Sequence, residues 1–148
     1  MPLIRDYIAE HERVTNLGGD AVRAIDDHDF ETARRQLAQM ATELASHWEG
    51  EENGIFAVMQ RNDAAYADYI APLVVEHREL ADLLSTVELS DPADQRRVRE
   101  AVRELHEHIS KEEDGLFPAS LTALSGAEWD VAIDAWQEAH PNDSLLDN

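Results

Sequence analysis

One pattern of histidine and glutamate occurs twice in this chain of 148 residues, and it limits the folds that the chain can adopt. Each copy has an isolated histidine, a gap of 31 or 36 residues, a second histidine and a glutamate four residues after it. The two copies consist of His11, His47 and Glu51, and of His77, His108 and Glu112. Residues four apart on a helix project from the same face, so each His-x-x-x-Glu pair places an imidazole beside a carboxylate. The pattern predicts a helical bundle with four histidines and two glutamates in its core.

Turn-forming residues divide the chain into segments with helical periodicity. The breaks fall at 26–29, 62–63, 90–92 and 125–126, and Pro92 suits the first turn of a new helix. Between them, apolar residues recur at helical spacing and β-branched runs are few. We expect an all-α protein with helices at about 2–26, 29–60, 66–89, 92–120 and 126–139.

Short connections make consecutive helices antiparallel, so the predicted architecture is an up-down-up-down four-helix bundle. We expect a single domain over 1–148, with the bundle at about 2–120 and a short C-terminal helix at about 126–139 packed outside it. Gly18 and Gly19 lie inside the first helix, where they indicate either a kink or a close contact between helices.

The candidate ligands also lie at matching heights along the predicted helices. His11 is 17 residues from the turn near His28, and His47 is 19 residues beyond that turn. At about 1.5 Å per residue, these two legs agree to within roughly 3 Å. The legs on either side of the turns at Asp63 and Asp91 differ by two and three residues, so they also return to about the same level. The six side chains are therefore expected to meet in one layer.

Two carboxylates at one level of an apolar core need positive charge nearby. Burying an unpaired carboxylate costs several kcal/mol, and two of them repel each other. The nearby cationic residues fall on other helix faces; they are Arg34, Arg35, Arg103 and Lys111. Bound cations would supply the missing charge, so we expect a two-metal site. Nitrogen and oxygen ligands without sulfur suit Fe, Mn, Zn or Co, and the small number of ligands leaves positions open for a small molecule.

The remaining histidines, acids and aromatics near these positions have simpler interpretations. His106 points about 160° away from His108 and is expected at the surface, as are His28 and His140. Glu10 and Glu76 each precede a candidate ligand and are expected to be solvated rather than to support it. Tyr7 is favoured as a core residue, although a metal ligand or a hydrogen-bond donor are alternatives. Three rings are expected to pack around the site: Trp48, Phe56 and Phe117.

Composition restricts the partners and the compartment. The chain has 32 acidic and 12 basic residues, which gives a net charge of −20 and disfavours nucleic acid and anionic membrane surfaces. It has no cysteine, which excludes disulfides and thiolate metal sites. No apolar run approaches the roughly 18 residues of a membrane span, and the N-terminus does not have the layout of a signal peptide. We expect a cytoplasmic protein.

Four stretches resemble the hemerythrin-like (HHE cation-binding) domain family over roughly residues 5–122. They are EHERV, HWEGEENGIF, VEHREL and HEHISKEEDGLFP. The resemblance implies that the four histidines are terminal ligands and that Glu51 and Glu112 bridge a non-haem di-iron centre. Leu73 stands where oxygen-carrying hemerythrin has a further histidine, so the likeness is to the variety with four histidines and two glutamates. A ferritin-like bundle is not expected, because no acidic residue stands three before any histidine.

The resemblance implies a function built on two iron ions. The main expectation is a protein that binds or reacts with a small oxidant, which is dioxygen, hydrogen peroxide or nitric oxide, with peroxide removal as one form of that activity. The alternative is an oxygen, nitric oxide or iron sensor that binds without turnover. A metal store is less attractive, because two ions per chain are a small capacity.

Overall fold

The computed structural model describes residues 2–143, so the ends of the range expected for a single domain, Met1 and 144–148, lie outside the described residues. The described part is helical throughout and contains no strand, as the periodicity predicts. Its elements in chain order are α1 (Pro2–Asp26), α2 (Phe30–Asn53), α3 (Ile55–Asn62), α4 (Ala64–Thr86), α5 (Pro92–Lys111), the π-helix η1 (Glu112–Leu116), α6 (Phe117–Ala123) and α7 (Gly126–Ala139).

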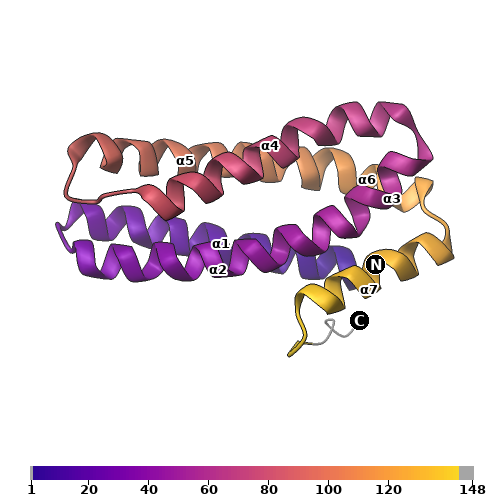
Figure 1. The fold of residues 1–148 in the computed structure, drawn as a ribbon, viewed down its shortest axis with the longest axis horizontal. Coiled ribbons are helices and arrows are strands. Elements are labelled where there is room, and N and C mark those ends of the chain that lie inside the picture. The colour runs from indigo at the N-terminus through magenta and orange to yellow at the C-terminus, as the bar shows by residue number, and fades with distance from the viewer. Residues whose placement is uncertain (1, 144–148) are drawn as a thin grey trace.

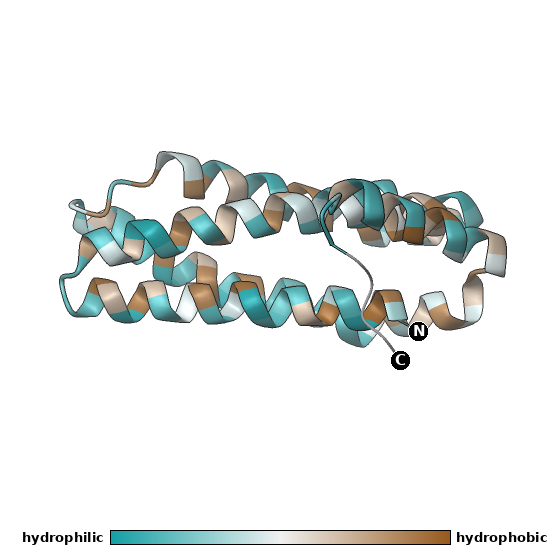
Figure 2. Ribbon diagram, turned by 90° about the horizontal axis from the view of Figure 1, so that it is seen from below, coloured by the Kyte–Doolittle hydropathy of each residue, from teal (hydrophilic) through white to brown (hydrophobic). Residues whose placement is uncertain are grey.

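The long helices form the predicted up-down-up-down bundle. In Figure 1, α1 and α2 run side by side along one side of the molecule, and α4 and α5 run along the other. The short helix α7 packs outside the bundle, beside α2 and near the N-terminus, as expected (Figure 1). Figure 2 shows hydrophilic and hydrophobic residues interspersed along every helix, as is typical of amphipathic helices. None of the described helices is long and apolar enough to cross a membrane.

Side-chain caps fix where several helices begin. Asp29, Asp63 and Asp91 each accept a hydrogen bond from a backbone N–H in the first turn of α2, α4 and α5. Ser125 and Glu128 form a reciprocal capping box at the start of α7. These are the breaks that the sequence indicates, and they set the antiparallel order of the helices.

Two of the predicted long helices are interrupted, which corrects the expected continuous spans. The helix expected at 29–60 breaks at Gly54, where α2 ends and α3 begins. The helix expected at 92–120 changes to a π-helical turn at Glu112–Leu116 before α6. The helix expected at 66–89 is shifted, because Asp63 caps α4 and Thr86 ends it. Both interruptions directly follow or include one of the core glutamates.

Gly18 marks a close contact between helices rather than a kink. A Cβ atom at Gly18 would lie 3.2 Å from a methyl group of Val102 on α5 and 3.6 Å from the Met40 Cε on α2. The absence of a side chain there lets α1 approach both neighbours.

The hydrophobic core has two parts that are separated by a polar layer. One cluster of buried residues packs toward the end formed by the α1–α2 and α4–α5 turns; it includes Val14, Ile25, Leu37, Met40, Leu44, Leu89 and Val98. The other packs toward the end that carries the N-terminus and α7; it includes Leu3, Tyr7, Ile55, Phe56, Ile70, Leu73 and Phe117. On every long helix, the candidate ligands lie between these two clusters.

Candidate metal centre

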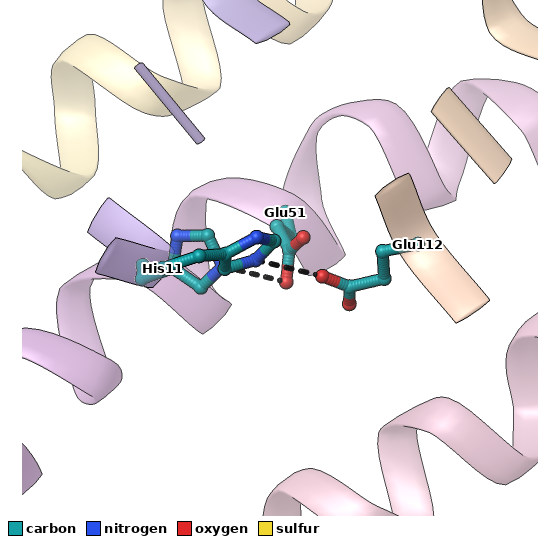
Figure 3. A group of neighbouring side chains, drawn as sticks. His11, Glu51 and Glu112 are labelled. Atoms are coloured by element: carbon teal, nitrogen blue, oxygen red, sulfur yellow. Dashed lines mark hydrogen bonds and ion pairs between the residues drawn. The ribbon is translucent and has the colours of Figure 1, made fainter. Parts of the chain in front are cut away.

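The structure brings all six predicted side chains into the polar layer. Each is buried, with at most 5% of its surface exposed, and Glu51 and Glu112 are fully buried. Their donor atoms form two groups in which all atoms lie within 4.8 Å of one another: His11, His47, Glu51 and Glu112, and His77, His108 and Glu112. Glu112 belongs to both groups, and Glu51 Oε1 lies 3.7 Å from His77 Nε2. Figure 3 shows His11, Glu51 and Glu112 pointing toward one another from separate helices.

The two glutamates stand where the helices become irregular. Glu51 is followed three residues later by Gly54, and Glu112 by Gly115. At Glu112 the chain enters η1, and the N–H of Phe117 donates to the Glu112 carbonyl in the i to i+5 pattern. A π-helical turn shifts the side chains that follow it and is frequent at functional sites. The Tyr69 hydroxyl donates to the Lys111 carbonyl at 2.7 Å, beside this turn.

The four imidazoles are oriented with Nε2 inward. The Nε2 atoms of His11 and His47 lie 3.0 Å apart, and so do those of His77 and His108. Three of the Nδ1 atoms face a carboxylate at hydrogen-bond distance: His11 with Glu113 at 2.7 Å, His47 with Glu10 at 3.1 Å, and His77 with Glu52 at 2.8 Å. The fourth, His108 Nδ1, is 3.6 Å from Glu76.

This orientation fits metal ions. A carboxylate partner keeps the proton on Nδ1, so that the Nε2 lone pair is free for a metal. Two such lone pairs that face each other at 3.0 Å repel, unless a proton or a cation lies near both. The Glu51 oxygens also accept no hydrogen bond although they are fully buried, which is costly for a carboxylate. Cations in this layer would satisfy both sets of atoms.

The two central glutamates have opposite electrostatic environments. Burial raises the pKa of Glu51 well above its usual value, and the nearby Glu112 carboxylate adds to the effect. Burial acts on Glu112 in the same direction, but hydrogen bonds from His108, His11 and His77 lower its pKa well below the usual value. Burial would lower the pKa of His11, whereas its contact with Glu112 raises it. Without a metal, the layer therefore depends on protons held between histidines and Glu112.

Two further acids of this layer were not predicted from the sequence. Glu52 and Glu113, which directly follow the central glutamates, accept from the Nδ1 atoms of His77 and His11. Each of them thus supports a histidine of the other repeat. The doubled acid after each His-x-x-x is the sequence signal for this role, because its repetition at both places has no explanation in helix formation alone.

Two predictions about exposure were wrong. Glu10, expected to be solvated, is 4% exposed and binds His47. His140, expected at the surface, is 9% exposed and contacts Glu10. Both are covered because α7 packs against α1 and α2. Glu76 is partly exposed and pairs with Lys111 at 3.0 Å.

The other predictions about neighbouring residues are confirmed. His28 and His106 are exposed. Tyr7 is fully buried in the core, where it stacks on Phe117 and meets the His47 ring edge-on. Aromatic rings cover the histidines: Trp48 and Phe56 stack against His77, and Phe117 stacks against His11. These rings cover one histidine of each half of the layer.

Comparison with known proteins gives one match. No curated protein and no solved structure matches the chain. The family model of the hemerythrin HHE cation-binding domain matches residues 3–120, which include all six candidate ligands. Domains of this family bind metal ions, typically iron, in agreement with the two groups of histidine and glutamate donors. Because the match spans most of the 148 residues, the chain belongs to the hemerythrin HHE cation-binding domain family.

Proposed function

We propose that this chain is a non-haem di-iron protein that binds or reduces a small oxidant, which is dioxygen, hydrogen peroxide or nitric oxide. The observation that carries the proposal is the pair of inward-facing Nε2 contacts, each at 3.0 Å, beside two fully buried carboxylates. That donor set has nitrogen and oxygen but no sulfur, which suits iron.

The side chains divide between two ions. His11 and His47 would hold one ion together with Glu51, and His77 and His108 would hold the other. Glu112 lies within reach of both groups, and Glu51 contacts both His47 and His77. These two carboxylates would therefore bridge the ions. Four histidines and two bridging glutamates leave open positions, at which a di-iron centre supplies electrons and Lewis acidity to a bound oxidant.

The protein around the centre controls access and places a hydrogen-bond donor beside it. The rings of Trp48, Phe56 and Phe117 exclude bulk water from the histidines. Burial and the nearby Glu51 and Glu10 carboxylates raise the pKa of Tyr7 well above its usual value, so its phenol stays a neutral O–H donor beside His47. A groove of about 320 Å³ between α4 and α5 reaches His108, and it gives a small molecule a path toward the layer.

The proposal is tested by loading the protein with ferrous iron without oxygen and measuring iron per chain. The visible spectrum is then followed as hydrogen peroxide or nitric oxide is added. Peroxide turnover with oxygen release supports an enzyme, and a stable adduct without turnover supports a binding protein or sensor. The matched control is His106→Ala, which removes an exposed histidine two residues from His108 and should keep both ions. Fewer than one ion per chain in the unmodified protein would overturn the proposal.

A further inference from the structure

Among the four acids that face the outer nitrogens of the histidines, Glu10 has a different environment. The side chains of Glu52, Glu76 and Glu113 are each about one third exposed, at 30 or 31%. The Glu10 side chain is 5% exposed. The four acids occupy corresponding places around the same layer, so the burial of Glu10 needs its own explanation.

Two side chains of the C-terminal segment cover Glu10. The indole Nε1 of Trp136 donates to Glu10 Oε2 at 3.3 Å, and the same oxygen accepts from His47 Nδ1 at 3.1 Å. His140 Nε2 forms an ion pair with the other oxygen, Oε1. One Glu10 oxygen thus accepts two hydrogen bonds, and the other lies against the His140 ring nitrogen.

Trp136 and His140 also fix each other. Their rings stack with centroids 4.1 Å apart and planes 13° apart. His140 Nδ1 donates to the Trp136 carbonyl at 2.7 Å, so that both ring nitrogens of His140 are used. Trp136 is 3% exposed and packs in the core cluster that contains Tyr7. The pair is buried and held by its own contacts, so it is not a surface contact.

Gly54, at the break after α2, allows α7 to come close enough for these contacts. A Cβ atom at Gly50 would lie 3.5 Å from the Trp136 Cα, which is ordinary contact distance. At Gly54, a Cβ atom would lie 3.1 Å from the Ala132 carbonyl oxygen and 2.6 Å from that of Gly50. A larger residue at Gly54 would therefore displace α7. The break between α2 and α3 thus lies just after Glu51 and also makes room for α7.

We infer that Trp136 and His140 are positioning residues for the metal centre: they hold Glu10, which orients His47. This inference rests on the proposed function, because it assigns His47 to a metal. The two residues lie beyond the family match at residues 3–120, so the support comes from a part of the chain that the match does not include. A hydrogen-bonded partner behind a metal-bound histidine typically changes metal affinity by 10- to 100-fold. The C-terminal helix therefore makes the ion at His11 and His47 the more tightly held of the two.

The test measures the release of Co²⁺ from the full-length protein to an excess of chelator, in which two bound ions give two phases. Trp136→Phe keeps the ring and removes the N–H donor, and His140→Phe keeps the stacking and removes both donors. Each should accelerate one phase about 10-fold and leave the other unchanged. Trp129→Phe, on the same helix and with its ring in the same cluster, should leave both phases unchanged. His140→Gln restores an N–H donor at the place of Nε2 and should recover the original rate.

A second readout distinguishes positioning from general stability. In the Zn²⁺-loaded protein, the Nδ1 proton of His47 should give a downfield NMR signal that shifts in Trp136→Phe and not in Trp129→Phe. Equal acceleration of both phases, together with a lower melting temperature, would mean that α7 only stabilises the fold and would overturn the inference. Unchanged release in Trp136→Phe and His140→Phe would also overturn it, while two bound ions would leave the proposed function intact. Failure of the unmodified protein to bind Co²⁺ or iron would instead overturn the proposed function.

Discussion

The two halves of the metal centre come from two copies of one sequence pattern, yet the structure makes them unequal. In both halves the first acid of the doubled Glu-Glu pair points into the layer, and the second supports a histidine of the other half: Glu52 supports His77, and Glu113 supports His11. The difference lies outside the layer. Glu10 in the first half is buried under α7, whereas Glu76 in the second half is partly exposed and pairs with Lys111. A repeated motif thus gives similar ligands, and the surroundings decide how firmly they are held.

The central glutamates are unequal as well. Glu112 lies 2.9 Å from His11 Nε2 and accepts a hydrogen bond from His108 at 3.0 Å. The oxygens of Glu51 accept no hydrogen bond, and its nearest histidine nitrogen, on His47, is 3.2 Å away. Glu112 is therefore organised by the histidines even without metal, whereas Glu51 would gain partners only from the proposed metal ions.

The largest expected effect is a difference in iron content between variants of these two glutamates. Glu112→Ala should reduce iron from about two ions per chain to about one, because it leaves only His77 and His108 in the second donor group, whereas the first group keeps three donors. Glu51→Ala should keep closer to two, because each donor group retains two histidines and Glu112. Iron per chain after anaerobic loading and gel filtration measures the difference. Equal loss in the two variants would show that the halves share both glutamates equally.

A second comparison concerns the stability of the metal-free protein, which substitutions of the two glutamates should change in opposite directions. Glu51→Met removes a buried carboxyl group that has no hydrogen-bond donor, so it should stabilise the metal-free protein by about 2 kcal/mol. Glu112→Met removes the acceptor that holds three histidines and should destabilise it by about 2 kcal/mol. Urea unfolding in the presence of a chelator measures both changes. The prediction is wrong if both substitutions shift stability in the same direction.

The glycines that follow the two glutamates give a third comparison. A Cβ atom at Gly54 would meet backbone atoms of Gly50 and Ala132, which cannot move independently, so Gly54→Ala should cost about 3 kcal/mol. At Gly115 it would meet the Tyr69 hydroxyl at 2.5 Å, the end of a side chain that can rotate, so the cost should be about 1 kcal/mol, mainly the lost hydrogen bond.

Two controls sharpen this glycine comparison. Gly126→Ala should be nearly neutral, because no atom lies within 4 Å of the added Cβ. In a Tyr69→Phe background the cost of Gly115→Ala should disappear, since the clashing hydroxyl is gone. A cost that persists in that background would place the strain in the π-helical turn itself. All four variants are compared by urea unfolding of the metal-loaded protein.

Much of the fold and the layer of six side chains followed from the sequence for a physical reason. Helical periodicity and a fixed rise per residue determine both the face and the height of each side chain. His11 and His47 could therefore be placed at one level from their distances to the intervening turn, and the structure brings their Nε2 atoms to 3.0 Å.

The errors concern contacts that no single helix encodes. Glu10 was expected in solvent because it points in a different direction from its neighbour His11, and His140 because it directly precedes Pro141. They are buried because they meet across 130 positions of the chain once α7 docks. The break at Gly54 was missed because the apolar pattern of α2 continues in phase into α3. Glu52 and Glu113 were missed because adjacent residues on one helix point in different directions, and their partners lie on other helices.

The smallest expected effect tests whether the second half can be made more like the first. Lys111 Nζ binds both oxygens of Glu76, at 3.0 and 3.3 Å, and Glu76 Oε1 remains 3.6 Å from His108 Nδ1, which is too far for a hydrogen bond. Lys111→Met should free Glu76 to accept a hydrogen bond from His108 Nδ1. The faster phase of Co²⁺ release should then slow by about 3-fold. This is less than the roughly 10-fold effect of a buried partner, because Glu76 stays partly exposed to water.

Removal of the Lys111 charge would by itself also slow Co²⁺ release, because it removes a repulsion between two cations. Two variants separate this electrostatic effect from that of a hydrogen bond between Glu76 and His108. Lys111→Arg keeps the positive charge beside Glu76 and should leave the release rate unchanged. In a Glu76→Gln background, Lys111→Met should have no further effect if the carboxylate is the element that acts on His108. If Lys111→Met still slows Co²⁺ release in the Glu76→Gln background, the slowing comes from the overall negative charge of the chain, which is already −20. The inequality of the halves would then arise from α7 alone, since Lys111 would no longer account for the weaker hold on His108.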